Sequence, residues 1–188
     1  MEIFMIDFFK KNSRMITKSL LNQFGAAVLA LTITIPASSK NWLLAFISCF
    51  SIAFYLILLY TSMWEEGGKE KIRIDGGRAE YSPWRGFFIS LCANIPNILL
   101  GVLIVIGSIF GSSGSAFGFG WAAAVNSGAR FIAMLWESMY LGLITLYSPN
   151  NPIGFILIIL PALLVSTLGY MAGLKGIKII KKRNGKSQ

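Results

Sequence analysis

The sequence predicts an all-α protein, a polytopic integral membrane helical bundle, and two observations lead to this prediction. Of its 188 residues, 55% are hydrophobic and only 13% are charged, whereas a soluble domain carries about 25% charged residues. In addition, 15 of the 17 Lys and Arg residues fall within residues 10–18, 69–85 and 175–186. The chain between these basic patches is almost free of charge, as expected for the spans of one membrane domain formed by residues 1–188.

The basic patches also predict the orientation of the chain. Lys and Arg collect in the cytoplasmic segments beside membrane spans, so we expect a plasma-membrane protein with both termini cytoplasmic. The formal net charge of +9 would suggest nucleic-acid binding in a soluble protein. The patches lack the interleaved aromatic residues that such binding uses. We therefore expect these charges to face a lipid bilayer with an anionic inner leaflet, and no nucleic acid.

The chain begins with a basic segment and a weak apolar run. Residues 1–18 place apolar side chains before four basic ones, which predicts a cytoplasmic amphipathic helix that leads into the first span. An ordinary basic flank of a signal anchor is the alternative. Residues 19–38 are expected to cross the membrane. A cleaved signal peptide is the alternative for this run, because small residues follow its apolar core.

Three further runs are long enough to cross a bilayer, which takes about 20 apolar residues. The first is bracketed by Trp42 and Trp64, as is typical of aromatic residues at the membrane interface. The other two contain Pro96 and Pro161, and each proline is expected to kink its helix because it removes a backbone donor. The three runs are residues 42–63, 86–110 and 153–173.

The number of spans depends on the predicted outer segment, residues 111–152. Residues 131–147 are apolar enough to cross, but a fifth span would export the basic cytoplasmic tail at residues 174–188, against the charge rule. A sixth span would need residues 111–128, of which half are Gly or Ser. We therefore predict four spans plus a non-spanning outer or re-entrant helix. Five and six spans are the alternatives.

The only large polar segment is the predicted cytoplasmic loop at residues 65–85. Basic and apolar side chains alternate over residues 71–74, before a Gly-rich turn, which is a hairpin signal. An isolated hairpin is marginally stable, so this one would need a partner to pack on; a solvated connector is the alternative. The candidate residues for docking a partner are Lys71, Arg73, Arg78 and Arg85.

Glu137 is the first candidate for a functional residue, because it is the only acidic residue outside the polar cytoplasmic segments. An ionisable group at membrane depth is rare and points to function. Glu137 would carry a proton, bind a cation or pair with Arg130. A spacing of seven places the two residues on one helical face but about 10 Å apart along the axis, which disfavours direct contact. If residues 131–147 are interfacial, Glu137 simply faces water.

Asn94, Pro96 and Asn97 form the second candidate site, inside a predicted span. Pro96 is expected to open the helix, and the two asparagines, three residues apart, share a face near that break. Discontinuous helices with polar residues at mid-membrane are typical of transporters. A kink that is stabilised by amide side chains and binds no ligand is the alternative.

The sequence contains no catalytic, metal-binding or cofactor-binding pattern. It has no histidine, and Cys49 and Cys92 lie in apolar runs without a metal or redox spacing, so we expect both to pack as small apolar side chains. We therefore expect no enzymatic activity and no cofactor. The pairs Ala26–Ala30 and Gly169–Gly173 predict close helix packing, within one chain or between the subunits of a homo-oligomer.

Several short motifs that contain glycine flank the predicted spans: Trp64…Gly67-Gly68-Lys69, Gly77-Arg78, Gly86 before the span with Pro96, and Gly169-Tyr170…Gly173…Lys175. Together they resemble small polytopic membrane proteins of Gram-positive bacteria that have no assigned function. The resemblance covers about half of the chain. It implies a bacterial inner membrane with the tail inside, and it supplies no activity and no site residue.

Three functions are compatible with these observations. We expect a membrane subunit or accessory protein of a bacterial transport or secretion system, which docks a cytoplasmic or membrane partner through residues 65–85 and the tail. The chain is small for a solitary carrier and has no nucleotide site, so a partner would supply the energy. The alternatives are a stand-alone immunity or stress-protection protein that works through residues 111–152, and an oligomeric proton or ion pathway that uses Glu137.

Overall fold

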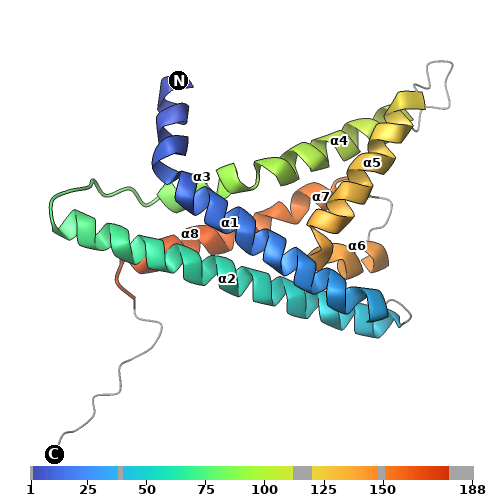
Figure 1. The fold of residues 1–188 in the computed structure, drawn as a ribbon, viewed down its shortest axis with the longest axis horizontal. Helices are drawn as coiled ribbons and strands as arrows, with labels where there is room; N and C mark the ends of the chain where they lie inside the picture. Colours follow the sequence, from blue (N-terminus) through green and yellow to red (C-terminus); the bar gives the residue numbers. More distant parts are fainter. Residues whose placement is uncertain (1, 38–39, 112–119, 148–150, 178–188) are drawn as a thin grey trace, which may run out of the picture.

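The predicted all-α class is confirmed by the computed structural model, which describes residues 2–37, 40–111, 120–147 and 151–177. Residues 38–39, parts of the outer segment (112–119 and 148–150) and the tail from residue 178 lie outside the described residues. Within the described ranges, all secondary structure is helical (Figure 1). The elements are α1 (Glu2–Ala37), α2 (Asn41–Asp75), α3 (Arg85–Ala93), α4 (Ile95–Gly111), α5 (Gly120–Trp136), the 3-10 helix η1 (Ser138–Tyr140), α6 (Leu141–Tyr147), α7 (Gly154–Leu157) and α8 (Ile159–Leu174).

Three segments are long and apolar enough to cross a membrane: Asp7–Ala37, Asn41–Asp75 and Gly154–Leu174. Two pairs of helices would add one span each if each bent pair crosses as a unit. They are α3 with α4, bent by 54°, and α5 with η1 and α6, bent by 88°. The described residues thus contain three to five candidate spans, which is consistent with a helical membrane bundle.

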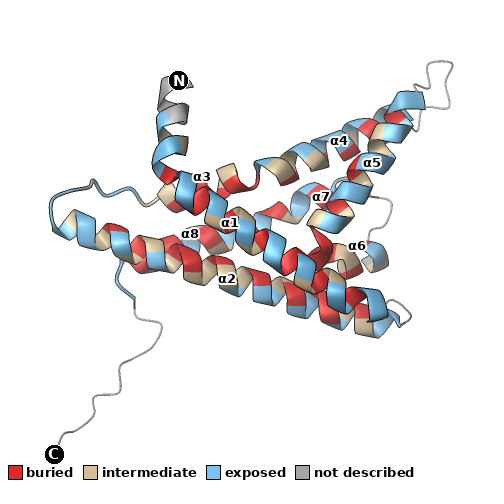
Figure 2. Cartoon of the chain, in the orientation of Figure 1, coloured by how far each residue is buried: buried red, intermediate tan, exposed pale blue. Residues whose placement is uncertain are grey.

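Helices α1, α2 and α8 form the body of the molecule, while α4 and α5 form a hairpin that leaves it at an angle (Figure 1). Buried residues follow the faces where these helices meet (Figure 2). The outer faces carry large apolar side chains, such as Phe46 at 65% and Phe131 at 64% exposure. So much exposed apolar surface suits a lipid environment and would be a liability in water.

Glycine permits a close contact between α2 and α8. A Cβ atom on Gly67 would overlap the carbonyl oxygen of Tyr170, and one on Gly173 would overlap the carbonyl oxygen of Trp64. Gly86, near the start of α3, is covered by the ring of the fully buried Tyr170. Several residues of the glycine motifs that flank the predicted spans therefore lie at one packing site, where the missing side chains let the backbones approach.

The two predicted small-residue pairs both pack within the chain. Gly169 meets the backbone of Tyr60 on α2, one turn before the Gly173 contact. Ala26 and Ala30 on α1 are 1% and 0% exposed and belong to the main hydrophobic core. These pairs therefore account for internal helix packing.

The hairpin predicted within residues 65–85 is wrong, because α2 continues to Asp75 and only residues 76–84 connect it to α3. The helix ends in a turn in which Gly77 adopts a φ of +67°, a conformation that glycine adopts without strain. Residues two apart on a helix point about 200° apart. Of the two alternating isoleucines, Ile74 packs on the core and Ile72 is 74% exposed. The alternation of basic and apolar residues over residues 71–74 is therefore compatible with a helix.

The Gly- and Ser-rich range 111–128, which a sixth span would need, is helical in its described part. Residues from Gly120 onward begin α5, which runs on to Trp136 and packs against α4. The small residues face that contact, since Gly107 meets Asn126 and Gly111 meets Ala123. The described part of this range thus belongs to α5 and adds no separate sixth span.

The proline predictions hold to different degrees. The helix that contains Pro96 opens at Asn94, between α3 and α4. Near Pro161 the helix is interrupted only at Ile158, and Gly154–Leu174 remains one segment of 21 residues.

Cys92 is partly buried against the core, but Cys49 is exposed on α2. The packing prediction for Cys49 is wrong, because its face of α2 points away from the other helices.

Alanine substitutions at two adjacent glycines test the α2–α8 contact. Gly67→Ala is expected to lower the free energy of unfolding by about 1–3 kcal/mol, because the new methyl group overlaps α8. In the matched control Gly68→Ala, the added Cβ meets no atom within 4 Å, and the better helix former should raise stability by about 0.5–1 kcal/mol. Unfolding of the purified protein in detergent measures both. Equal effects at the two positions would contradict the contact.

Candidate functional site

Both sharp bends of the chain lie beside one small polar cavity. The break between α3 and α4 falls at Asn94, and the break between α5 and η1 falls at Glu137. Both residues line a cavity of about 10 Å³, which is room for about one water molecule or a small ion. The polar residues that line it are Gln23, Tyr55, Asn94, Asn97, Glu137 and Tyr140.

Asn97 is the centre of a buried hydrogen-bond network on one side of this cavity. Its Oδ1 accepts hydrogen bonds from Gln23 Nε2 at 2.9 Å and from Trp136 Nε1 at 2.8 Å. Its Nδ2 donates to Asn94 Oδ1 at 2.8 Å and to Gln23 Oε1 at 3.3 Å. The indole of Trp136 can only donate, which fixes the orientation of the Asn97 amide. The network joins α1, α4 and α5 at the point where the chain bends.

Glu137 lies on the other side of the cavity without such partners. The residue is 2% exposed, and neither carboxylate oxygen has a hydrogen-bond partner among the described residues. Its backbone is held in place, because its N–H donates to the carbonyl of Ala133 at 2.7 Å and its carbonyl accepts from Tyr140 at 2.8 Å. A buried carboxylate without a partner is costly, so this group requires a proton or a cation.

The two candidate sites predicted within the membrane meet in the structure. Asn94, Asn97 and Glu137 lie around the cavity, and Pro96 lies beside them in the first turn of α4. Arg130 belongs to a different group: its Nε donates to Asn126 Oδ1 at 3.0 Å, and its guanidinium lies over a phenyl ring of α7. The alternative in which Glu137 simply faces water is wrong, because the α5–η1 bend turns it into the helix bundle.

Sequence reasoning missed four residues of this site. Gln23 contributes part of the polarity that makes the first apolar run weak, and that polarity was the available signal. The side chains of Tyr55, Trp136 and Tyr140 carry one polar atom each within apolar runs. Such residues are common at membrane interfaces and in cores, so the sequence offers no sign that Tyr55 and Tyr140 line the cavity or that Trp136 bonds Asn97.

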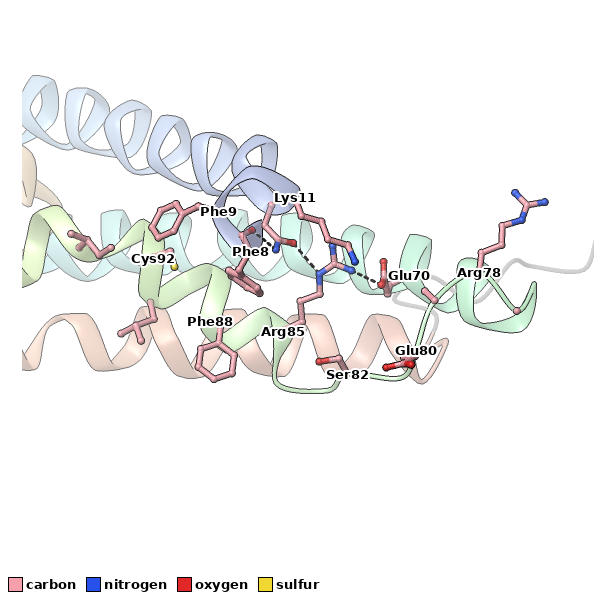
Figure 3. A pocket seen from close by; sticks show the side chains of 15 residues that line it. Phe8, Phe9, Lys11, Glu70, Arg78, Glu80, Ser82, Arg85, Phe88 and Cys92 are labelled. Carbon is pink, nitrogen blue, oxygen red and sulfur yellow. Dashed lines mark hydrogen bonds and ion pairs between the residues drawn. The ribbon is translucent and has the colours of Figure 1, made fainter. Parts of the chain in front are cut away.

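The four residues predicted to dock a partner lie near the C-terminal end of α2 and in the segment that follows it. Their environments differ. Arg85 donates through Nη1 to Glu70 on α2 and through Nε to Asn12 Oδ1 on α1, the latter at 2.9 Å (Figure 3). These two bonds tie α1, α2 and α3 together, and the Arg85 side chain is only 11% exposed. Arg73 also donates to Glu70, at 3.2 Å, but its side chain is 53% exposed. Arg78 is exposed and Lys71 is half-buried.

Fold and site together define an all-α protein, consistent with a helical membrane bundle, that holds a buried carboxyl group at two helix breaks. Within the described ranges, no group of three or more His, Cys, Asp or Glu residues could hold a metal ion. Comparison with protein-family models, curated proteins and solved structures finds no match to this chain.

The role of Asn97 can be tested against a second asparagine in the same bundle. Asn97→Leu should lower the free energy of unfolding by at least about 2 kcal/mol, because it leaves buried groups of Gln23, Asn94 and Trp136 without partners. Asn22 makes a single hydrogen bond, to Ser62 Oγ at 2.9 Å, so Asn22→Leu should cost only about 0.5–1.5 kcal/mol. Denaturant unfolding in detergent measures both. A larger loss for Asn22→Leu would contradict the network.

Proposed function

We propose that this protein is an integral membrane component of a bacterial transport or secretion system, and that Glu137 is the residue at which it takes up a proton or a monovalent cation. The observation that carries the proposal is a buried carboxyl group without a hydrogen-bond partner, in a cavity beside two helix breaks. An ionisable group in such a position is rare and expensive, and is generally retained for function.

The chemistry of the cavity supports a small monovalent ion. The cavity combines the carboxylate of Glu137 with amide groups of α1 and α4 and the phenol groups of Tyr55 and Tyr140. Oxygen atoms are the ligands that hard cations prefer. A single carboxylate balances a single positive charge, and about 10 Å³ leaves no room for a larger substrate.

The broken helices support a transport role. Transporters place ion sites where discontinuous helices meet, because an opened helix offers unpaired backbone groups inside the membrane. Here the α3–α4 and α5–η1 bends of 54° and 88° lie beside one cavity. The α4–α5 hairpin connects the two bends, so a change in occupancy at Glu137 acts on both ends of that hairpin.

The size of the chain and its surface support a component that works with a partner. With 188 residues and no nucleotide-binding pattern, the protein depends on an ion gradient or on a partner for energy. Large apolar side chains are exposed on the α4–α5 hairpin, including Leu99 at 59% and Phe131 at 64%. Exposed bases at the end of α2 offer a docking surface for a soluble subunit.

Substitution of Glu137 tests the ion site. Lithium, sodium and potassium are titrated into the purified protein at constant ionic strength. The preferred ion should raise the free energy of unfolding by about 2.7 kcal/mol at 100 times its Kd. Glu137→Gln fills the same volume without a charge and should abolish this gain, whereas Glu80→Gln, on the exposed connection, should retain it. A site for protons alone would show no cation effect, but the pH dependence of unfolding would differ between wild type and Glu137→Gln. Wild-type behaviour of Glu137→Gln in both titrations would refute the site.

Purification from native membranes tests the partner. The tagged protein, extracted in mild detergent, should retain a permease or an ATPase in a fixed ratio, identified by mass spectrometry. The double variant Lys71→Glu/Arg73→Glu should reduce retention of a soluble subunit about 30-fold, because each of the two bases at a docking surface is worth about 1 kcal/mol. Lys40→Glu is the control, since it lies at the other end of α2. A wild-type protein that purifies alone would contradict the accessory role.

A further inference from the structure

A large amphipathic pocket lies beside Arg85 and is distinct from the small cavity beside Glu137. Its volume is about 930 Å³, within the range of about 300–1,000 Å³ that is typical of small-molecule sites. The pocket is lined mainly by the early turns of α1, the connection at residues 76–84, and α3 (Figure 3). Glu70 of α2 and Ile95 at the start of α4 complete the lining.

The pocket has a polar end and an apolar end. Figure 3 shows Glu70, Arg78 and Glu80 toward one side, with Phe8 and Cys92 toward the other. The phenyl rings of Phe8 and Phe88 meet edge to face, with centroids 6.2 Å apart. The apolar lining continues along α3 to Leu91 and on to Ile95 at the start of α4. The bent pair of α3 and α4 is a candidate for crossing the membrane.

The polar end carries an excess of positive charge. Lys11, Arg78 and Arg85 line the pocket together with two acids, Glu70 and Glu80, so its formal charge is 3 − 2 = +1. The two carboxylate oxygens of Glu70 already accept hydrogen bonds from arginines, one from Arg85 and the other from Arg73. A ligand at this end therefore meets the cationic side chains more than the charge of Glu70.

We propose that this pocket binds one anionic glycerophospholipid of the inner leaflet, with its headgroup at the basic end that Lys11 and Arg78 line and its acyl chains along Phe8 and Phe88. Basic pockets between membrane helices on the cytoplasmic side are suited to such headgroups. The match rests on charge and on polarity: the basic end lies among the basic patches, and the apolar end leads along α3. The proposal depends on the membrane location of the chain and is independent of Glu137.

A defined lipid pair tests the site. The full-length protein, purified in detergent and stripped of lipid, is titrated with phosphatidylglycerol or phosphatidylcholine, and native mass spectrometry counts the lipids that remain bound. One phosphatidylglycerol should bind at least about tenfold more tightly than phosphatidylcholine. Each exposed base at a headgroup site is worth about fivefold in affinity, so Lys11→Gln/Arg78→Gln should weaken phosphatidylglycerol binding about 30-fold.

Matched controls separate this site from general attraction between the protein and anionic lipid. Lys69→Gln removes an equally exposed base outside the pocket, and Phe46→Ala removes an exposed ring elsewhere; both should bind like the wild type, whereas Phe88→Ala should weaken both lipids. Equal affinity for the two lipids, or equal losses in Lys11→Gln and Lys69→Gln, would overturn the proposal. Displacement of the lipid by millimolar inorganic phosphate would show a simple anion site and would overturn it as well.

Discussion

A helix that breaks inside a bilayer exposes polar groups that no surrounding solvent can satisfy, and the protein itself must satisfy them. This constraint accounts for the centre of the structure. The breaks at Asn94 and Glu137 lie together, and the amide of Asn97 uses both lone pairs and both hydrogens to join α1, α4 and α5 beside them. The network supplies the rigidity that the open helices lack. Beside this network, neither carboxylate oxygen of Glu137 has a hydrogen-bond partner among the described residues, and the hydroxyl of Tyr140 in the same cavity has none either.

The rest of the bundle is held together by close packing between helices. The α2–α8 contact relies on bare backbone at Gly67 and Gly173, and van der Waals packing of this kind is what holds helices together in lipid, where the hydrophobic effect between them is lost. Because α1, α2 and α8 supply the stable body, α4 and α5 can leave it as a hairpin.

The two cavities differ in size and in lining, and each matches the ligand proposed for it. The cavity beside Glu137 is small, buried and lined by oxygen-bearing groups, which suits an ion and excludes a larger solute. The pocket beside Arg85 is about 930 Å³, with a charged end and an apolar end, which suits an amphipathic molecule. Arg85 itself is held by Glu70 and Asn12, so its first role is to join α1, α2 and α3, and the exposed bases around it are the ones available to a ligand.

The sequence by itself determined the helical class, the positions of the apolar runs, the break near Pro96 and the unusual character of Glu137, because each of these follows from local composition or from the covalent chemistry of one residue. It misread the end of α2 as a hairpin, since the extent of that helix depends on its packing against α8. Only the tertiary structure decided that Gln23, Asn97 and Glu137 share one site. Residues more than a hundred positions apart meet through the bends and packing of whole helices, and no local pattern of side chains encodes that.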